Sequence, residues 1–357
     1  MPNWTRSMEQ SFEYYLVDPD TWGDERLLQT VTNCSITRDL GNDTLGSATL
    51  DADEELNDQY VRVYLVTFQD RIRERFCLGT FLCQTADLSY DGKRQYRSYD
   101  CYTPLIELKE NPMEIGYSLL KNDNLLQRAI GIVEESVRAP VVPATDTRQE
   151  MILEKNFVSE QSDTRLTFVT DLLKIGKYSL GLDELGRVIF EPYQELAALR
   201  PKYEFNDGNS SILYPEIKIR GELFDIPNVV DVIYSSQTSN KTMRCTKIND
   251  DPNSPVSTVT RGRRITFRDT NPSIGDSATQ EILELYTENL LKQKSTVEYT
   301  LTYSHGYCPV RLNDCVRLSY ERAGIKDTNA RIIRQVIHCE PGCKVEETSI
   351  FTEKLWR

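Results

Sequence analysis

The sequence predicts an α+β protein that is mainly β. Apolar and polar residues alternate with the period of half-buried strands through much of residues 1–110, and the alternation returns after residue 210. Between these regions apolar residues recur at helical spacing instead. In a chain of 357 residues, long enough for two to three domains, this order predicts two β modules joined by a helical linker and a small α+β domain.

The first β module is expected to span residues 1–110. Two alternating runs predict strands, and Asp91-Gly92 has the composition of a tight hairpin turn before a strand at residues 95–99. The alternating positions are Val61, Val63, Leu65, Phe76, Leu78, Thr80 and Leu82.

The linker, residues 111–150, is predicted to contain a helix. Asp123 or Asn124 can cap its first turn, because a short polar side chain accepts hydrogen bonds from free backbone N–H groups. Pro140 and Pro143 end it. The apolar positions at helical spacing are Leu125, Leu126, Ala129, Ile130, Val133 and Val137.

The small α+β domain, residues 151–205, is predicted to be a helix followed by a hairpin. Ser162 or Asp163 can start the helix, and Gly176 stands where a C-terminal cap belongs. Alternating residues on both sides of the turn at residues 183–186 indicate the two hairpin strands.

The second β module is expected at residues 206–357, with residues 237–262 as an exposed loop because they are polar and rich in turn residues. One helix, residues 277–293, is inserted, and Ser277 three residues before Gln280 forms a capping box. Its expected buried face is Ile282, Leu285, Tyr286 and Leu290. The expected strands lie around residues 217–219, 229–233, 297–303, 316–318 and 332–337.

The charge argues against a protein that grips nucleic acid. The formal net charge is −13, whereas such proteins gain affinity by neutralising phosphates with clustered Lys and Arg. One compact basic cluster exists, and a solvated strand or loop edge is favoured over a phosphate contact. Its members are Arg261, Arg263, Arg264 and Arg268.

The acidic residues are concentrated at the start of the chain. Residues 1–60 hold 13 Asp and Glu but only 3 Lys and Arg, a net charge of −10. Two interpretations stay open, a solvated, loop-rich arm and an acidic docking or lumen-lining surface.

The nine cysteines do not indicate a disulfide framework, since the chain is long and shows no signal peptide. Cys339 and Cys343 flank a Pro-Gly pair, and with His305, Cys308 and His338 they are candidate zinc ligands. A hairpin turn with free or disulfide-paired thiols is favoured, because no second tight Cys pair completes a four-ligand site.

No catalytic motif is present in the sequence. Phosphate-binding glycine loops, H-E-x-x-H and G-x-S-x-G are all missing, and 55 acidic residues offer carboxylate pairs without a motif to select one. The two His, His305 and His338, are expected to be structural. We therefore expect no enzymatic activity, no cofactor and no metal site. We also expect no membrane insertion, since no apolar run approaches the ~18 residues of a spanning helix.

Seven segments, taken in order, resemble the baseplate hub proteins of contractile phage tails and of related phage-like particles. Residues 34–40 resemble the opening strand of that family and residues 224–230 its entry into a second barrel. Pro309 to Val316 is similar to its P-x-x-x-N-D-x-V strand. The other segments are residues 76–81 and 96–100, which resemble strands closing the first barrel, and residues 164–176 and 183–188, which resemble the small central domain.

The resemblance implies two tail-tube-like β-barrel domains, the first at residues 1–110 with its acidic arm and the second at residues 206–357. It also implies a homotrimer, in which three chains form a pseudo-sixfold ring that joins the hexameric tail tube, or a tube-initiator protein, to the central spike. Baseplate wedge and tape-measure proteins are further implied partners, and DNA passes through the lumen without specific binding. The implied location is the tail baseplate of the virion, after assembly in the host cytoplasm.

Two other functions stay open. The first is a receptor- or glycan-binding module of a tail fibre or adhesin, although the sequence shows neither repeats nor a long β-stalk pattern. The second, less favoured, is a cell-wall hydrolase, although no hydrolase module follows residue 345. The cysteine content is unusual for a hub and raises the option that some pairs stabilise a particle outside the reducing cytosol.

Overall fold

The computed structural model describes residues 2–90, 92–93, 95–144, 151–236, 241–270, 272, 274 and 278–355. The chain forms two compact units. Unit 1 comprises Met1–Ile217 and Tyr303–Ser349, and unit 2 comprises Lys218–Thr302 and Ile350–Arg357.

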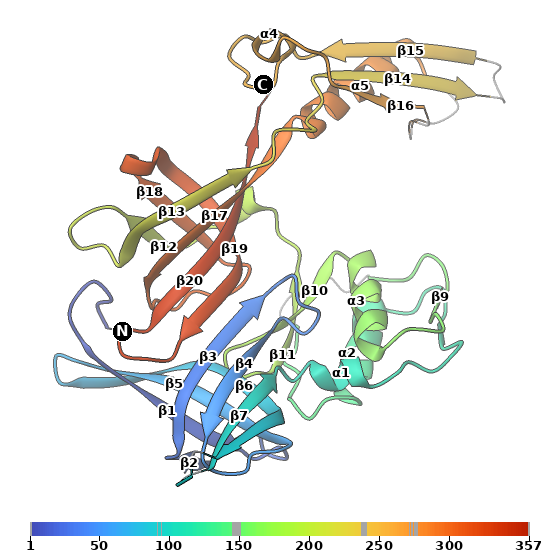
Figure 1. Cartoon of the computed structure of the whole chain (residues 1–357). Helices are drawn as coiled ribbons and strands as arrows, with labels where there is room; N and C mark the ends of the chain where they lie inside the picture. The colour runs from blue at the N-terminus through green and yellow to red at the C-terminus, as the bar shows by residue number, and fades with distance from the viewer. Residues whose placement is uncertain are drawn as a thin grey trace. The chain divides into compact units, whose positions relative to one another are not determined.

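The main sheet has 13 strands in two groups (Figure 1). The first group is β1 (Glu9–Val17), β2 (Asp24–Leu28), β3 (Val31–Asp39), β4 (Gly46–Ala52), β5 (Gln59–Gln69), β6 (Ile72–Tyr90) and β7 (Gln95–Tyr102). The second group is β12 (Pro201–Asn206), β13 (Leu213–Gly221), β17 (Thr296–Gly306), β18 (Cys315–Tyr320), β19 (Ile325–His338) and β20 (Lys344–Lys354). The strand order is β13-β17-β20-β19-β3-β4-β7-β6-β5-β1-β2, with β18 paired to β19 and β12 to β18.

The two predicted β modules share this one sheet, because β19 pairs with both groups. Its first part, up to Arg331, runs antiparallel to β18. Its last residues pair with β3, from Arg334 opposite Asp39 to His338 opposite Ser35. A strand of 14 residues is long enough to do both. The contact between the modules is therefore continuous backbone pairing.

The acidic start of the chain is part of the sheet, so the interpretation of residues 1–60 as a loop-rich arm is wrong. Four strands, β1 to β4, lie in this segment. Strand β1 pairs with β5 along its whole length and places Tyr14, Leu16 and Val17 in the core. Its apolar side chains decide the local structure, while the charged residues occupy the outward positions and turns.

The predicted linker and small domain pack as one body around a shared core. Helices α2 (Leu125–Glu134) and α3 (Arg165–Ile175) contact each other, as Figure 1 shows. Asn124 caps α2, as one of the two predicted alternatives. Thr164 caps α3 in a capping box with Thr167, so the predicted caps Ser162 and Asp163 are wrong by one or two residues. The other elements are α1 (Ile106–Glu110), β8 (Ser118–Leu119), β9 (Phe157–Val158), β10 (Tyr178–Leu182), β11 (Val188–Pro192) and η1 (Leu196–Ala198).

The sequence predicts a single inserted helix, but in the structure this helix belongs to a larger body, unit 2. Unit 2 contains a three-stranded sheet in the order β15-β14-β16, with a core of its own. The prediction of an exposed loop at residues 237–262 is wrong from residue 241 on, where a strand and a short helix lie, and residues 237–240 are outside the described residues. The elements of unit 2 are β14 (Val229–Ser236), β15 (Lys241–Ile248), α4 (Thr258–Arg261), β16 (Thr266–Asp269) and α5 (Gln280–Lys294). The short helix η2 (Glu321–Ala323) lies in unit 1.

Helix α5 packs on the core with part of its predicted face, since Tyr286 and Leu290 are partly buried against the core of unit 2. Its N-cap is Thr279, whose hydroxyl accepts a hydrogen bond from the backbone of Ile282, while Ser277 lies outside the described residues. Ile282 and Leu285 are exposed. The buried side chains are Leu283, Thr287 and Leu291, which recur every four residues and form a stripe of their own. Both stripes contain apolar residues, so the periodicity does not determine which one is fully buried.

Candidate functional site

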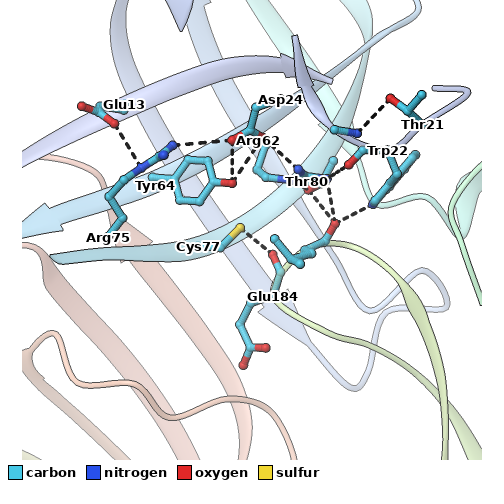
Figure 2. Close-up of polar contacts among 12 residues, drawn as sticks. Glu13, Thr21, Trp22, Asp24, Arg62, Tyr64, Arg75, Cys77, Thr80 and Glu184 are labelled. Atoms are coloured by element: carbon cyan, nitrogen blue, oxygen red, sulfur yellow. Dashed lines mark hydrogen bonds and ion pairs between the residues drawn. The ribbon is translucent and has the colours of Figure 1, made fainter. Parts of the chain in front are cut away.

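The hairpin β10–β11 is docked onto the first group of strands through a set of buried polar contacts. We call Trp22, Asp24, Arg62, Thr80 and Leu185 the hairpin clamp. Figure 2 labels the first four of them. Arg62 of β5 is at its centre, with its side chain 4% exposed. Its Nε donates to Thr80 Oγ1 at 2.9 Å and its Nη1 to Asp24 Oδ1 at 2.8 Å. Its Nη2 donates to the carbonyl oxygen of Trp22 at 3.0 Å.

The carbonyl oxygen of Leu185, in the hairpin turn, is the acceptor that joins the hairpin β10–β11 to the first group of strands. It accepts from Trp22 Nε1 at 2.8 Å and from Thr80 Oγ1 at 2.9 Å. Arg62 Nη2 approaches it at 3.3 Å. Because three donors, from β5, β6 and the connection between β1 and β2, converge on one backbone atom, the turn has one preferred position on the sheet.

Gly186, the next residue, is required by the same docking. Its φ of +75° lies in the left-handed region, and a Cβ added there would lie 2.7 Å from Thr80 Cβ. The neighbouring Glu184 contributes its carbonyl oxygen, to which Cys77 Sγ donates at 2.8 Å. The sequence indicates the turn at residues 183–186, but nothing in it indicates what the turn contacts.

Charged and aromatic side chains surround Asp24 at the edge of the clamp. Tyr64 Oη donates to Asp24 Oδ2 at 2.9 Å, and burial followed by this hydrogen bond raises the pKa of Tyr64 to about 12. The guanidinium of Arg75 lies 4.0 Å from the centre of the Tyr64 ring and pairs with Glu13. These contacts pair Glu13 of β1 and Asp24 of β2 with arginines of the same chain.

A second buried polar group, the Glu347 cluster, consists of Tyr303, His305, Gln335, Glu347 and Ser349 on β17, β19 and β20. Glu347 Oε2 lies 3.1 Å from His305 Nε2 and accepts from Gln335 Nε2 at 2.9 Å. Tyr303 donates to Glu347 Oε1, and Ser349 lies 3.4 Å from the same oxygen. Burial, and next the negative charge of Glu347, hold the pKa of Tyr303 well above its usual range.

His305 therefore has the structural position that the sequence predicts. Neither His305 nor Glu347 has exposed surface, so no substrate reaches the imidazole in this conformation. Arg38 connects the cluster to the first group of strands, since it donates to Gln335 Oε1 at 3.1 Å and to the carbonyl oxygen of Leu78 at 2.6 Å. The group can stabilise the sheet, and it presents no general base to a substrate.

His338 and the two cysteines after it lie beside β3. His338 Nε2 is 3.4 Å from Glu346 Oε1 on the next strand. The backbone N–H of Cys339 donates to the carbonyl oxygen of Cys34 at 3.0 Å, and the Cys339 thiol, together with burial, raises the pKa of Cys34 well above its usual range. All nine cysteines are free thiols in the structure. Whether Cys339 or Cys343 forms a disulfide in solution stays a prediction.

The candidate zinc ligands Cys308, Cys339, Cys343, His305 and His338 are not gathered into a cluster with metal-ligand geometry. In the part of the chain that the structure describes, no group of three or more His, Cys, Asp or Glu side chains is placed to hold a metal ion. A search of the same residues finds no helix with the length and apolar character needed to cross a bilayer.

The basic cluster belongs to unit 2 and makes contacts within it. Arg268 Nε donates to Asp231 Oδ2 at 2.9 Å, and Arg261 Nη1 donates to the carbonyl oxygen of Ile226 at 2.9 Å. Arg263 lies over the ring of Phe224. These partners support the interpretation of the cluster as a structural strand and loop edge rather than a phosphate contact.

A cavity of about 560 Å³ lies in unit 1 beside β11. Four charged side chains on its wall form ion pairs, Lys202 with Asp314 at 2.6 Å and Arg311 with Glu191 at 2.9 Å, and Arg331 donates to the carbonyl oxygen of Gln194. Neither His lines it. The cavity therefore offers hydrogen-bonding surface but no nucleophile paired with a base.

Comparisons with solved structures show the fold. The chain is similar to the tail protein from Neisseria meningitidis MC58, with 12% identity, a TM-score of 0.61, and 97% of this chain and 98% of that chain covered. It is similar to the 43 kDa tail protein of prophage MuSo2 from Shewanella oneidensis, with 15% identity, a TM-score of 0.60 and coverages of 95% and 98%. A chain of the Francisella PdpA–VgrG complex matches with 10% identity, a TM-score of 0.57 and coverages of 97% and 58%.

These likenesses extend over nearly the whole chain, so the protein has the mainly β fold of phage tail proteins, and the predicted fold class is confirmed. Neither protein-family models nor curated protein sequences give a match.

Proposed function

We propose that the chain is the structural baseplate hub of a contractile phage tail or of a related phage-like particle. The observation that carries the proposal is the likeness to two tail proteins over at least 95% of this chain and 98% of each of theirs. The two buried polar groups agree with a structural role. The side chains of the hairpin clamp form hydrogen bonds within the clamp, and those of the Glu347 cluster form hydrogen bonds within the cluster. The proposal assigns no reaction to the chain.

The proposed assembly is a homotrimeric ring with pseudo-sixfold symmetry. One chain contributes two groups of strands, so three chains supply six, which is the number needed to match a hexameric tube. The strand order of the main sheet ends at β2 and β13 among the described residues. Unpaired strand edges are templates for pairing with another chain, and a ring gives each edge a partner.

The proposed partners are the tail tube or its initiator protein on one side and the central spike on the other, with wedge and tape-measure proteins around them. A net charge of −13 suits a ring through which DNA passes without being held. The proposed location is the tail baseplate of the virion, after assembly in the host cytoplasm.

The test is the mass of the purified full-length chain in native buffer, followed by imaging of the particle. The proposal expects a species of three times 41.2 kDa and a ring with threefold or pseudo-sixfold symmetry. A strictly monomeric chain at micromolar concentration, or its absence from purified tails, would overturn it.

A matched pair of variants locates the contact between chains. Leu27 lies on the edge strand β2 and is 39% exposed, and Leu120 is 60% exposed outside the main sheet. Leu27→Glu is expected to weaken the trimer and Leu120→Glu to leave it intact. Saturable binding on a glycan array would favour the adhesin function instead, and lysis in a zymogram would favour a hydrolase.

A further inference from the structure

Two fully buried cysteines face each other across neighbouring strands of unit 1. Cys83 on β6 and Cys101 on β7 are register partners in the antiparallel pair, and their Sγ atoms are 3.2 Å apart. They are 0% and 1% exposed. Opposite residues in an antiparallel pair have Cα atoms about 4.5 to 5.5 Å apart, which is within the range that a disulfide spans. We propose that Cys83 and Cys101 form an intramolecular disulfide when the protein meets a peroxide.

The surroundings distinguish this pair from the other thiols nearby. Cys34 and Cys343 are buried in the same core, and the partly exposed Cys339 packs against it. Cys34 has a neighbouring thiol of its own, since the backbone N–H of Cys339 donates to its carbonyl oxygen and the Cys339 side chain raises its pKa. The pair on β6 and β7 needs no movement of either strand, because the backbone already holds the two residues opposite each other.

Hydrogen peroxide is the oxidant in the proposed reaction. It is small enough to enter a core that larger thiol reagents do not reach. The thiolate of one cysteine attacks a peroxide oxygen, so that the sulfur becomes a sulfenic acid and the peroxide is reduced to water. The second thiol then attacks this sulfur, the S–S bond forms, and the sulfenic oxygen leaves as a second water. The two cysteines lose two electrons and two hydrogens in total.

Burial sets the rate of this reaction. The hydrogen bond to Cys83, together with burial, raises the pKa of Cys101 far above its usual range, and the thiolate that reacts is therefore scarce at neutral pH. Oxidation of the folded chain is expected to be slow, and the product to be shielded from reductants in the same way. The bond would persist in a particle that has left a reducing compartment.

The proposal is tested by peptide mapping of the full-length protein. The chain is treated with hydrogen peroxide, denatured, alkylated without reduction and digested with trypsin. We expect residues 76–93 joined to residues 98–109, at about 2 Da less than the sum of the two peptides. The first peptide also contains Cys77, so the digest is repeated on Cys77→Ala, in which the link must remain.

A thermal measurement gives a second readout, with a matched control. The bond closes a loop between residues 18 positions apart, and the oxidised chain is expected to unfold roughly 5 °C higher than the reduced one. Cys101→Ser is expected to abolish this shift, whereas Cys315→Ser, which changes another 1% exposed thiol, keeps it. The proposal is overturned if Cys83 and Cys101 of the wild-type chain are both still alkylated as free thiols, or if either is linked to Cys34. The mapping of the wild-type chain does not depend on how the variants fold.

Discussion

His305 Nε2 lies 3.1 Å from Glu347 Oε2, and neither side chain has exposed surface. They lie on β17 and β20, which are neighbours in the main sheet. Tyr303 and Gln335 donate to the same carboxylate, so its oxygens are satisfied without water. Such a buried polar group lowers the free energy of unfolding little while all its members are hydrogen-bonded. Removing one member leaves its partners unsatisfied and lowers this free energy further.

Removing the carboxylate is expected to destabilise unit 1 strongly. Glu347→Ala leaves the donors of Tyr303 and Gln335 buried without their acceptor, and the free energy of unfolding should fall by about 3 to 5 kcal/mol. Urea unfolding followed by circular dichroism measures the change. The control is Glu346→Ala, since this neighbour is 45% exposed on its side chain and pairs with Lys344, a kind of pair that contributes at most about 1 kcal/mol. Equal losses in the two variants would contradict the role of the buried cluster.

Substituting two glycines that have the same backbone conformation separates the effect of the clamp contact on stability from the effect of backbone strain. Gly186 has a φ of +75° and Gly324 one of +76°, but only a Cβ at Gly186 would meet a neighbour, Thr80 at 2.7 Å. Ala at either position costs about 1 kcal/mol for the left-handed backbone. Gly186→Ala should cost about 1 to 3 kcal/mol more, since the hairpin must move away from the strands.

Limited proteolysis of the turn at residues 183–186 gives the local readout for this pair. Cleavage should be faster in Gly186→Ala and unchanged in Gly324→Ala. If both variants lose the same stability and are cleaved alike, the turn is not clamped in solution.

Unit 2 should lose stability in acid through Asp231. Hydrogen bonds from Arg244, Thr246 and Arg268 lower the pKa of this carboxyl to about 2, despite its burial. The pKa in the unfolded chain is higher, so the unfolded state binds a proton first as the pH falls. The stabilisation is therefore complete above about pH 5 and is lost as the pH falls through about 2.

Calorimetry across this pH range measures the effect. The wild-type chain should unfold at higher temperature than Asp231→Asn at pH 7, with a gap that closes on acidification. Asp250→Asn, a change at an exposed carboxyl of the same unit, serves as the control and should track the wild type throughout. A gap that is independent of pH would show that the charge of Asp231 is not what matters.

Deleting residues 1–28 should abolish folding, because it removes β1 and β2. Strand β1 pairs with β5 over nine residues and covers part of the core. We expect an insoluble chain, measured by the soluble fraction on expression. The double change Asp20→Asn and Glu25→Gln removes charge at exposed positions and keeps the strands. It should fold normally, so any loss of particle assembly would then report on charge alone. A folded deletion variant would show that β1 is dispensable.

The local features of the fold could be predicted from the sequence where a short pattern determines them. Asn124 and Gly176 mark helix ends because capping depends on residues within one turn. The hairpin β10–β11 follows from alternation on both sides of a turn. Unit 2 could not be predicted as a separate body, since β14 reads as one more strand of the β module, while β15 lies in a segment whose polar and turn residues indicate a loop.

The candidate site could not be predicted, because its residues have no pattern in common. Arg62 stands between buried Val61 and Val63, in a position that alternation assigns to the solvent face. Its burial depends on Leu185, 123 positions along the chain. The signal that could have found it is weak, an arginine within an otherwise apolar strand.

The sequence by itself therefore determined the mainly β class, the positions of α2 and α3, and the lack of known catalytic motifs. These properties follow from spacing and residue type within a few positions of the chain. Only the tertiary structure decided that β3 pairs with β19, that a hairpin turn is clamped by Arg62, and that Glu347 accepts from Gln335 beside His305. Each of these depends on groups distant in the sequence that satisfy one another's hydrogen bonds once water is excluded, and no local pattern encodes which partner that will be.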